Sequence, residues 1–356
     1  MCNGYCHAQS GYLVYPNPFR GVQDMNRVRV CFFVLLLALM AFIVTSSVLV
    51  APAHASTPSS DDAAMETEDD DGTLLSPAEE SEPARSAIVP LPIDDSGGFV
   101  PDPDGYLSEW VYEDASISVR IVKGRANETD YLVATIKVAD PSQIRTAAAG
   151  KPNSQETAAG AVIAKRMNAV LAINTDYYSY RPNGYIVRQG VVCRQIPNTM
   201  DILFIDDRGD LHVVEYPTQQ KVAEFLASLE EDGRRVVNSF EFGPLLVRDG
   251  KKVEEIHYFD IGTVKPTQRM GIAQIGPLEY LCVSTEGPED PGSVGFTVEQ
   301  FAELMESLGA EIAYNMDGGS SNTLVFNNMK INSPKNRKIR SIPDILYFAT
   351  AVDLGI

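Results

Sequence analysis

The chain has 356 residues and a formal net charge of −19 at pH 7. Much of that charge lies in residues 56–104, which hold fourteen Asp or Glu and a single basic residue, Arg85. The chain after residue 104 is also acidic, and an acidic domain repels the phosphates of nucleic acid. A nucleic-acid partner is therefore not expected.

The first 50 residues indicate contact with a membrane. Residues 1–29 contain three arginines and one acid, and residues 30–50 carry no charge. A run of about 20 such residues is long enough to cross about 30 Å of hydrocarbon as a helix. Because the basic residues precede the run, residues 1–29 are expected in the cytoplasm and the C-terminal bulk outside it.

The apolar segment 30–50 has two alternative roles, transmembrane anchor or signal-peptide core. The long run favours a retained anchor, which predicts a single-pass protein of the cell membrane. Small residues at Ala53 and Ala55 have the spacing that a signal peptidase recognises, which predicts secretion after cleavage following Ala55. Both alternatives stay open, and both place the remaining chain outside the cytoplasm.

Residues 51–104 are predicted to be a disordered acidic linker. They are rich in Pro, Ser, Gly and acids and poor in large apolar residues, so they cannot bury enough surface to offset the entropy of ordering. Residues 105–356 remain, about 250 residues, which is enough for one sizeable core. We expect a single globular domain there.

Residues 105–356 combine many strand patterns with a few helical ones. Helices are predicted over 154–168, 218–232 and 297–308, the last with Thr297 as N-cap and Gly309 as its stop. The predicted fold class is α+β, with mixed β-sheets and a few packed helices. Strands are predicted, in chain order, over 117–124, 130–139, 169–178, 185–195, 201–207, 211–216, 235–251, 269–276, 279–287, 311–316, 322–331 and 345–350.

The cysteines and histidines of the domain give no metal pattern. Cys193 and Cys282 could form a disulfide outside the cytoplasm or stay as free thiols, and the sequence leaves both open. There is no CxxC pair with zinc spacing, and the chain has only four histidines. No metal ligand is assigned from the sequence.

The stretch AYNMDGGSSNTLVF at 313–326 places Asp317 at the end of a predicted strand, before Gly318 and Gly319. Strand ends hold side chains firmly while exposing them, and paired glycines let backbone N–H groups approach an anion or a sugar. A hairpin turn joining strands 311–316 and 322–331 is the alternative. From this motif alone the hairpin is favoured.

Two further stretches end apolar runs with polar groups. In AVLAINTDYY, Asn174 and Asp176 lie two apart on one side of an extended strand and precede Tyr177 and Tyr178, whose rings suit stacking on sugars; an Asx turn at a core edge is the alternative. In KPTQRMGI, the guanidinium of Arg269 has the planar fork that binds phosphate oxygens, although a lone arginine is more often an ion-pair residue.

The order of these stretches resembles the phosphodiester glycosidase family. The pieces are INTDYY, FGPLLVRDGK, TQRMGI, the helix and strand ending in NMDGGSS, and NRKIRSIPDILYF, over about 131–352. The NMDGGSS piece is similar to the Asn-x-Asp-Gly-Gly-x-Ser signature of the family. Thr175, Met270 and Ser320 stand where members often have Gly, Thr and Gly.

The resemblance implies an enzyme that cleaves a sugar-1-phosphodiester at the anomeric C–O bond and releases free sugar. Arg269 would hold the phosphate. Asp317 and Asp176 would be the two carboxylates of a glycosidase, one as base or nucleophile and the other as acid or sugar anchor, in an order that stays open. Residues expected to bind the substrate are Asn174, Asn315, Gly318, Gly319, Ser320, Ser321, Tyr177 and Tyr178.

The expected partner is a glycan or sugar phosphodiester, of the cell-surface or exopolysaccharide type with which many bacterial members are loosely associated. No cofactor is expected to be required. A rival is that the aspartates bind a hard cation such as Ca²⁺ or Mg²⁺, which carboxylates suit. The alternative function is a non-catalytic cell-surface glycan-binding module on an acidic stalk.

Overall fold

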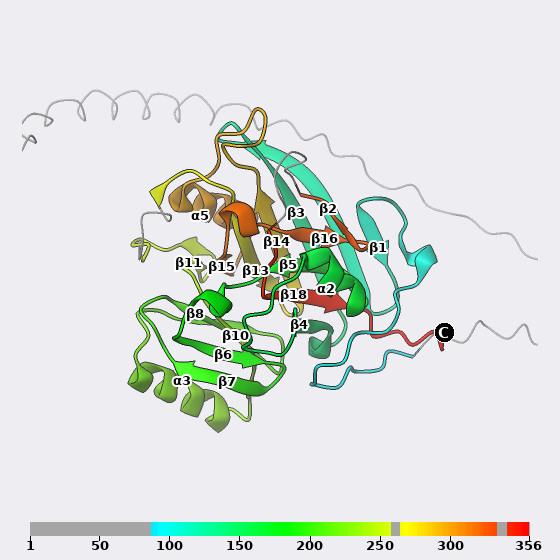
Figure 1. The fold of residues 1–356 in the computed structure, drawn as a ribbon, viewed down its shortest axis with the longest axis horizontal. Helices are drawn as coiled ribbons and strands as arrows, with labels where there is room; N and C mark the ends of the chain where they lie inside the picture. The colour runs from blue at the N-terminus through cyan, green and yellow to red at the C-terminus, as the bar shows by residue number, and fades with distance from the viewer. Residues whose placement is uncertain (1–86, 258–263, 333–339, 356) are drawn as a thin grey trace, which may run out of the picture. The chain divides into compact units, whose positions relative to one another are not determined.

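Antiparallel sheets dominate the computed structural model, which describes residues 87–257, 264–332 and 340–355 (Figure 1). The expected α+β class is confirmed in part, because the described residues form more sheet and less helix than that class suggests. All strand pairings in the three sheets are antiparallel. Each sheet packs against a helix and against another sheet.

The largest sheet has eight strands. In β2 the residues Ile117, Val119 and Ile121 are buried in alternation with more exposed neighbours, as expected for a strand with one face on the core. Its order is β1 (Val111–Glu113), β2 (Ile117–Ala126), β3 (Thr129–Val138), β14 (Glu279–Thr285), β13 (Met270–Gly276), β15 (Ile312–Met316), β11 (Leu245–Arg248) and β12 (Lys251–Lys252).

Two five-stranded sheets complete the strand framework. One has the order β7 (Val191–Ile196), β6 (Gly184–Arg188), β10 (Val236–Glu241), β8 (Ile202–Asp206) and β9 (Leu211–Val214). The other has the order β17 (Met329–Lys330), β16 (Leu324–Phe326), β5 (Ala169–Asn174), β18 (Asp344–Ala349) and β4 (Ile144–Ala148).

Three α-helices lie in the described residues, α2 (Gly160–Arg166), α3 (Gln219–Glu231) and α5 (Val298–Ser307). Helix α5 begins after Thr297, whose side chain accepts the N–H of Gln300 while the Gln300 side chain accepts the N–H of Thr297. Gly309, with φ of +84°, follows its end. Helix α2 is shorter than the predicted helix over 154–168.

The helices cover the outer faces of a layered core. One hydrophobic cluster joins the eight-stranded sheet to both five-stranded sheets, and a second packs α5 on the opposite face of the eight-stranded sheet. Separate clusters pack α2 on the sheet of β5 and β18 and α3 on the sheet of β8 and β10 (Figure 1). The site described below lies where strands of different sheets end beside one another.

Ordered packing begins before the expected boundary at residue 105. Leu91 is buried, and the fully buried Arg145 donates hydrogen bonds to the backbone carbonyls of Pro92, Asp94 and Ser96. Residues 92–96 contain few apolar side chains, and the hydrogen bonds from Arg145 to their backbone carbonyls hold them in place. The part of the predicted linker over 87–104 belongs to the folded unit.

The thiols of Cys193, in β7, and Cys282, buried in β14, are free. Of the two cysteine alternatives, the structure supports unpaired thiols. In the described ranges no helix has both the length and the apolar character that crossing a membrane requires. The apolar run 30–50 lies outside those ranges, so membrane contact stays a prediction.

Candidate active site

The ends of β5, β13 and β15 meet beside Asp317. Met316, the last residue of β15, pairs with Met270, the first residue of the antiparallel β13, so Asp317 directly follows one strand and Arg269 directly precedes its neighbour. The N–H of Asp317 donates to the carbonyl of Thr175, just after β5, at 3.0 Å. The hairpin alternative is wrong, because β15 pairs with β13 and β11 in one sheet while β16 pairs with β5 and β17 in another.

Asp317 is half-buried, and its carboxyl is one of the perturbed acids of this region. Burial raises its pKa to about 6, although hydrogen bonds from the Ser321 hydroxyl and the Gly318 N–H and the charges of Arg340 and Arg181 lower it. Arg340 also lies 3.4 Å, Nη1 to Oγ, from Ser321. A carboxyl with a pKa near neutrality can exchange protons at working pH.

The two glycines after Asp317 are favoured for different reasons, close packing at Gly318 and a left-handed backbone at Gly319. A Cβ at Gly318 would lie 2.4 Å from the carbonyl oxygen of Gln268, and Gly319 has φ of +55°. The Gly319 N–H donates to that same carbonyl at 3.0 Å. The Gly319 N–H is therefore engaged within the protein, and the Gly318 N–H faces the Asp317 carboxylate and lowers its pKa.

Asn174 connects the two sheets behind Asp317. Its Nδ2 donates to the carbonyl of Asp317 at 2.6 Å, and its Oδ1 accepts the N–H of Thr323 at 2.9 Å. The side chain is 2% exposed. One end of the amide thus holds the Asp317 backbone and the other holds Thr323, so Asn174 braces the two segments; its expected contact with sugar stays a prediction.

Asp176 belongs to a buried ionic network. Its Oδ1 accepts from Arg188 Nη2 at 3.0 Å, its Oδ2 accepts the N–H of Glu241 at 3.0 Å, and the residue is 3% exposed. Arg188 also donates to Asp344 at 2.7 Å, and Asp344 accepts from the Thr175 hydroxyl. Asp176 thus fixes the end of β5, and its expected role as an exposed catalytic carboxylate stays a prediction.

The charge of this network is set by opposing effects. Burial lowers the pKa of Arg188, but the carboxylates of Asp344 and Asp176 raise it by more, so the guanidinium stays charged. Burial raises the pKa of Asp344 to about 6 against the attraction of Arg188. Such a network orders its members only while each partner is present.

Arg269 directly precedes Met270, the residue that pairs with Met316 next to Asp317. It is 5% exposed. Its Nε donates to the carbonyl of Phe296 at 3.0 Å and its Nη2 to the carbonyl of Lys265 at 2.8 Å. At least two of its donors are therefore bound to backbone. Its phosphate contact stays a prediction.

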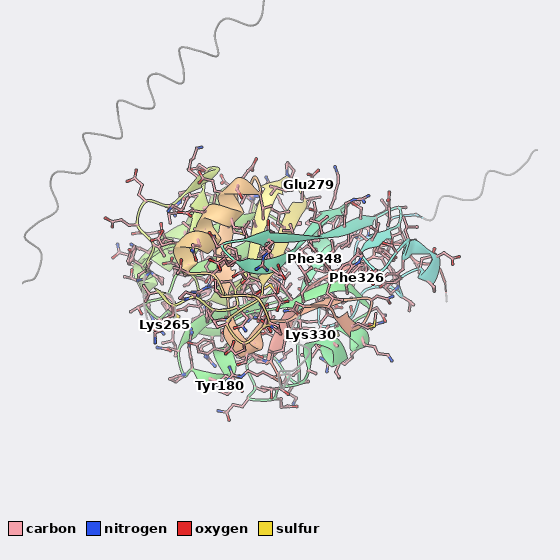
Figure 2. All side chains as sticks on the ribbon, turned by 90° about the horizontal axis from the view of Figure 1, so that it is seen from above. Tyr180, Lys265, Glu279, Phe326, Lys330 and Phe348 are labelled. Carbon is pink, nitrogen blue, oxygen red and sulfur yellow. The ribbon has the colours of Figure 1, made fainter. Side chains whose placement is uncertain are left out.

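The tyrosines after β5 differ in exposure. Tyr178 is buried and stacks below the guanidinium of Arg188, with 5.3 Å from Cζ to the ring centroid. Tyr177 is half-buried and lies under the guanidinium of Arg181 at 3.6 Å. Tyr180, in the short helix η3 (Tyr178–Tyr180), is 65% exposed and can be located in Figure 2. Only Tyr180 has a ring that is mostly free to meet a sugar.

Asn315, Ser320 and Ser321 complete the expected set. Asn315 is buried, donates to the carbonyl of Gly243 at 2.8 Å, and has an Oδ1 without a hydrogen-bond partner among the described residues. Ser321 is buried and donates to Asp317, whereas Ser320 is half-exposed. Of the expected set, Asn174, Gly318 and Ser321 contact Asp317. The contacts described for Asp176, Arg269 and Tyr178 are with other groups.

A profile of the phosphodiester glycosidase family matches residues 167–349, more than half of the chain. The chain belongs to the phosphodiester glycosidase family. It is accordingly a glycosidase that acts on phosphodiester-linked sugars. The matched segment contains every site residue predicted from the sequence.

Solved structures give this phosphodiester glycosidase a relative in fold. The zebrafish N-acetylglucosamine-1-phosphodiester alpha-N-acetylglucosaminidase catalytic domain, auto-inhibited by its pro-peptide, aligns with a TM-score of 0.52 at 16% identity, over 71% of this chain and 86% of that one. A hypothetical protein from Synechocystis aligns with a TM-score of 0.47 at 14% identity, over 68% and 64%. No curated protein matches the chain.

Three charged residues of the phosphodiester glycosidase site were not predicted from the sequence. Arg181 and Arg340 act on the Asp317 carboxyl, and Glu241 lies next to Asp176. Burial raises the pKa of Glu241 to about 7, against backbone hydrogen bonds from Tyr185 and Asn198. Arg340 stands in the NRKIRSIPDILYF piece and could have been singled out; nothing local marks the other two.

Among the described residues, the acidic side chains near Asp176 and Asp317 do not form a cation site. The described residues contain no group of three or more His, Cys, Asp or Glu arranged to hold a metal ion. Both oxygens of Asp176 accept protein donors, and Asp317 faces a hydroxyl and two arginine charges. Two arginine charges beside Asp317 suit an anion better than a further cation.

Proposed function

We propose that this enzyme hydrolyses sugar-1-phosphodiesters at the anomeric C–O bond, with Asp317 as the reacting carboxylate. The observation that carries the proposal is the setting of Asp317 at the end of β15, half-buried, hydrogen-bonded by Ser321 and flanked by the charges of Arg340 and Arg181. A carboxylate that can accept a proton could activate water, and two arginine charges beside it could stabilise a departing phosphate.

The proposed step balances as a hydrolysis. The oxygen of water bonds to the anomeric carbon while the C–O bond to phosphate breaks, and the bonding electrons leave with the phosphate oxygen. Asp317 takes the proton of the attacking water as general base, so the products are free sugar and a phosphomonoester. A phosphate is a good leaving group, and the step therefore needs no strong general acid on its side.

The pKa of Asp317 fits the role of a base at neutral pH. With a pKa of about 6 the carboxylate is mostly ionised at pH 7, yet basic enough to hold the proton as the transition state forms. The arginine charges favour this ionised form. As the phosphate acquires its second negative charge, they also stabilise the transition state more than the ground state.

Asp176 and Asn174 act in this proposal as positioning residues. Asn174 ties the Asp317 carbonyl to the Thr323 N–H, and Asp176 ties the end of β5 to Arg188 and to the Glu241 N–H. Held strand ends keep the carboxylate in one geometry, which catalysis requires. The half-exposed Ser320 and Tyr177 and the exposed Tyr180 are left to contact the sugar.

We also propose that the domain acts outside the cytoplasm. The uncharged run at 30–50, the arginines before it and the acidic stretch after it support a domain that works outside the cytoplasm on a cell-surface or exopolysaccharide-type substrate. Protease treatment of intact cells that carry a C-terminal epitope tests this placement. Digestion of the tag supports it, and protection of the tag in intact cells opposes it.

The reaction is tested by incubating the purified protein with a set of sugar-1-phosphodiesters and assaying both products. Free reducing sugar with a phosphomonoester supports the proposal, whereas release of alcohol with sugar phosphate retained indicates cleavage at phosphorus. Asp317→Asn should lose turnover and keep substrate affinity, while the exposed control Asp95→Asn should keep both. Binding without turnover in the wild type would indicate a glycan-binding module.

A further inference from the structure

The guanidinium of Arg181 is held in a fixed plane by two aromatic rings. Its Cζ lies 3.6 Å from the centroid of the Tyr177 ring and 5.7 Å from that of Phe242, and the two rings meet edge to face at 5.3 Å. Stacking on aromatic faces is a favourable setting for a weakly hydrated guanidinium. The group is therefore oriented before any ligand arrives.

One arm of this guanidinium has a partner and the other has none. Nη1 donates to the carbonyl of Glu241 at 3.0 Å. Nη2 is buried and has no hydrogen-bond partner among the described residues. A buried donor left unsatisfied costs free energy, and native proteins leave few of them. An anionic ligand at Nη2 would give this donor its bond.

The charge of Arg181 is directed to the reaction centre. It is one of two arginine charges that favour the ionised form of Asp317, the other being Arg340. Arg269 differs, because its Nε and Nη2 donate to backbone carbonyls. Of these arginines, Arg181 combines a rigid plane, a donor without a partner among the described residues, and a charge that acts on the reacting carboxylate.

We infer that Arg181 binds the phosphate of the substrate through Nη2 and stabilises it as it leaves. This inference rests on the proposed function and adds a residue that sets leaving-group specificity. The phosphodiester carries one negative charge and the departing phosphomonoester carries two, so the contact strengthens as the C–O bond breaks. A substrate with an uncharged aglycone would not use it.

The test compares two substrates of the same sugar, a sugar-1-phosphodiester and an aryl glycoside with an uncharged aglycone. Arg181→Gln should lower kcat/KM for the phosphodiester by about 100-fold or more, as loss of one donor to a developing anion does, and should change the aryl glycoside by less than about 5-fold. Arg181→Lys keeps the charge without the planar fork and should give an intermediate loss. Arg120→Gln, at an exposed arginine of β2, is the control for lost positive charge.

Binding of methyl phosphate gives a readout independent of turnover. The wild type and Arg120→Gln should bind it, with competition against the phosphodiester, and Arg181→Gln should bind it at least about 10-fold more weakly. Equal loss on both substrates, or unchanged methyl phosphate affinity in a folded Arg181→Gln, overturns the inference. If the wild type releases no free sugar from any phosphodiester, the proposed function fails, while methyl phosphate binding still tests Arg181.

Discussion

Replacing Asp317 by Asn is expected to stabilise the protein above pH 7. Burial raises the pKa of Asp317 from 3.8 to about 6, so the folded protein holds this proton more tightly than the unfolded chain does. The protonated carboxyl therefore contributes to the free energy of unfolding in full below about pH 4, and this contribution is lost as the pH rises through about 6. Asn has no such loss, since it does not ionise.

The magnitude follows from the same values. Each pKa unit corresponds to about 1.4 kcal/mol, which sets a ceiling of about 3 kcal/mol for ionising Asp317 in the folded protein. Because the side chain is partly exposed, water screens the penalty, and we expect Asp317→Asn to gain about 1 to 2 kcal/mol at pH 8. Enzymes commonly give up stability of this size at reacting groups.

Urea unfolding of the wild type and Asp317→Asn at pH 4 and pH 8 provides the assay, with Asp95→Asn as the exposed control. The expected result is a gain at pH 8 that shrinks toward zero at pH 4, and no pH-dependent gain in the control. A variant that is less stable than the wild type at pH 8, or equally shifted at both pH values, would refute the reasoning about Asp317.

Three further outcomes are expected. Arg188→Met leaves two buried aspartates without their cation and should destabilise the fold by about 3 to 5 kcal/mol, seen as a lower urea midpoint. The pH profile of kcat/KM should rise through about pH 6 as Asp317 ionises. Arg340→Gln should move the midpoint of this profile to higher pH, because the substitution removes a charge that lowers the Asp317 pKa. Gly318→Ala places a Cβ 2.4 Å from the Gln268 carbonyl and should lower thermal stability and turnover together, whereas unchanged melting would contradict the close packing.

Local sequence signals predicted the elements well where the determining contacts are local. Thr297 and Gly309 fixed the ends of α5 because the capping bonds and the left-handed turn involve neighbours in the chain. The helix expected over 154–168 formed only from Gly160 to Arg166, and the hairpin favoured for 313–326 did not form. Strand partners such as β5 for β16 are about 150 residues away in the chain, and local pattern does not encode them.

The candidate site shows the same division. The position of Asp317 after an apolar strand and before two glycines made it a candidate, and the resemblance of NMDGGSS to the family signature made it a predicted catalytic carboxylate. The settings of Asp176 and Arg181 depend on partners remote in sequence, Arg188 and Asp344 for the first and Phe242 for the second. The sequence therefore indicated which polar residues gather at the strand ends but could not show which of them are buried supports.

The position of bond cleavage is tested most directly by hydrolysis in ¹⁸O-labelled water. The protein is incubated with a sugar-1-phosphodiester, and both products are analysed by mass spectrometry after a short reaction. Attack at the anomeric carbon predicts one ¹⁸O atom in the released sugar, in excess of a no-enzyme exchange control, and none in the phosphomonoester. Label in the phosphate and none in the sugar beyond exchange would contradict the account.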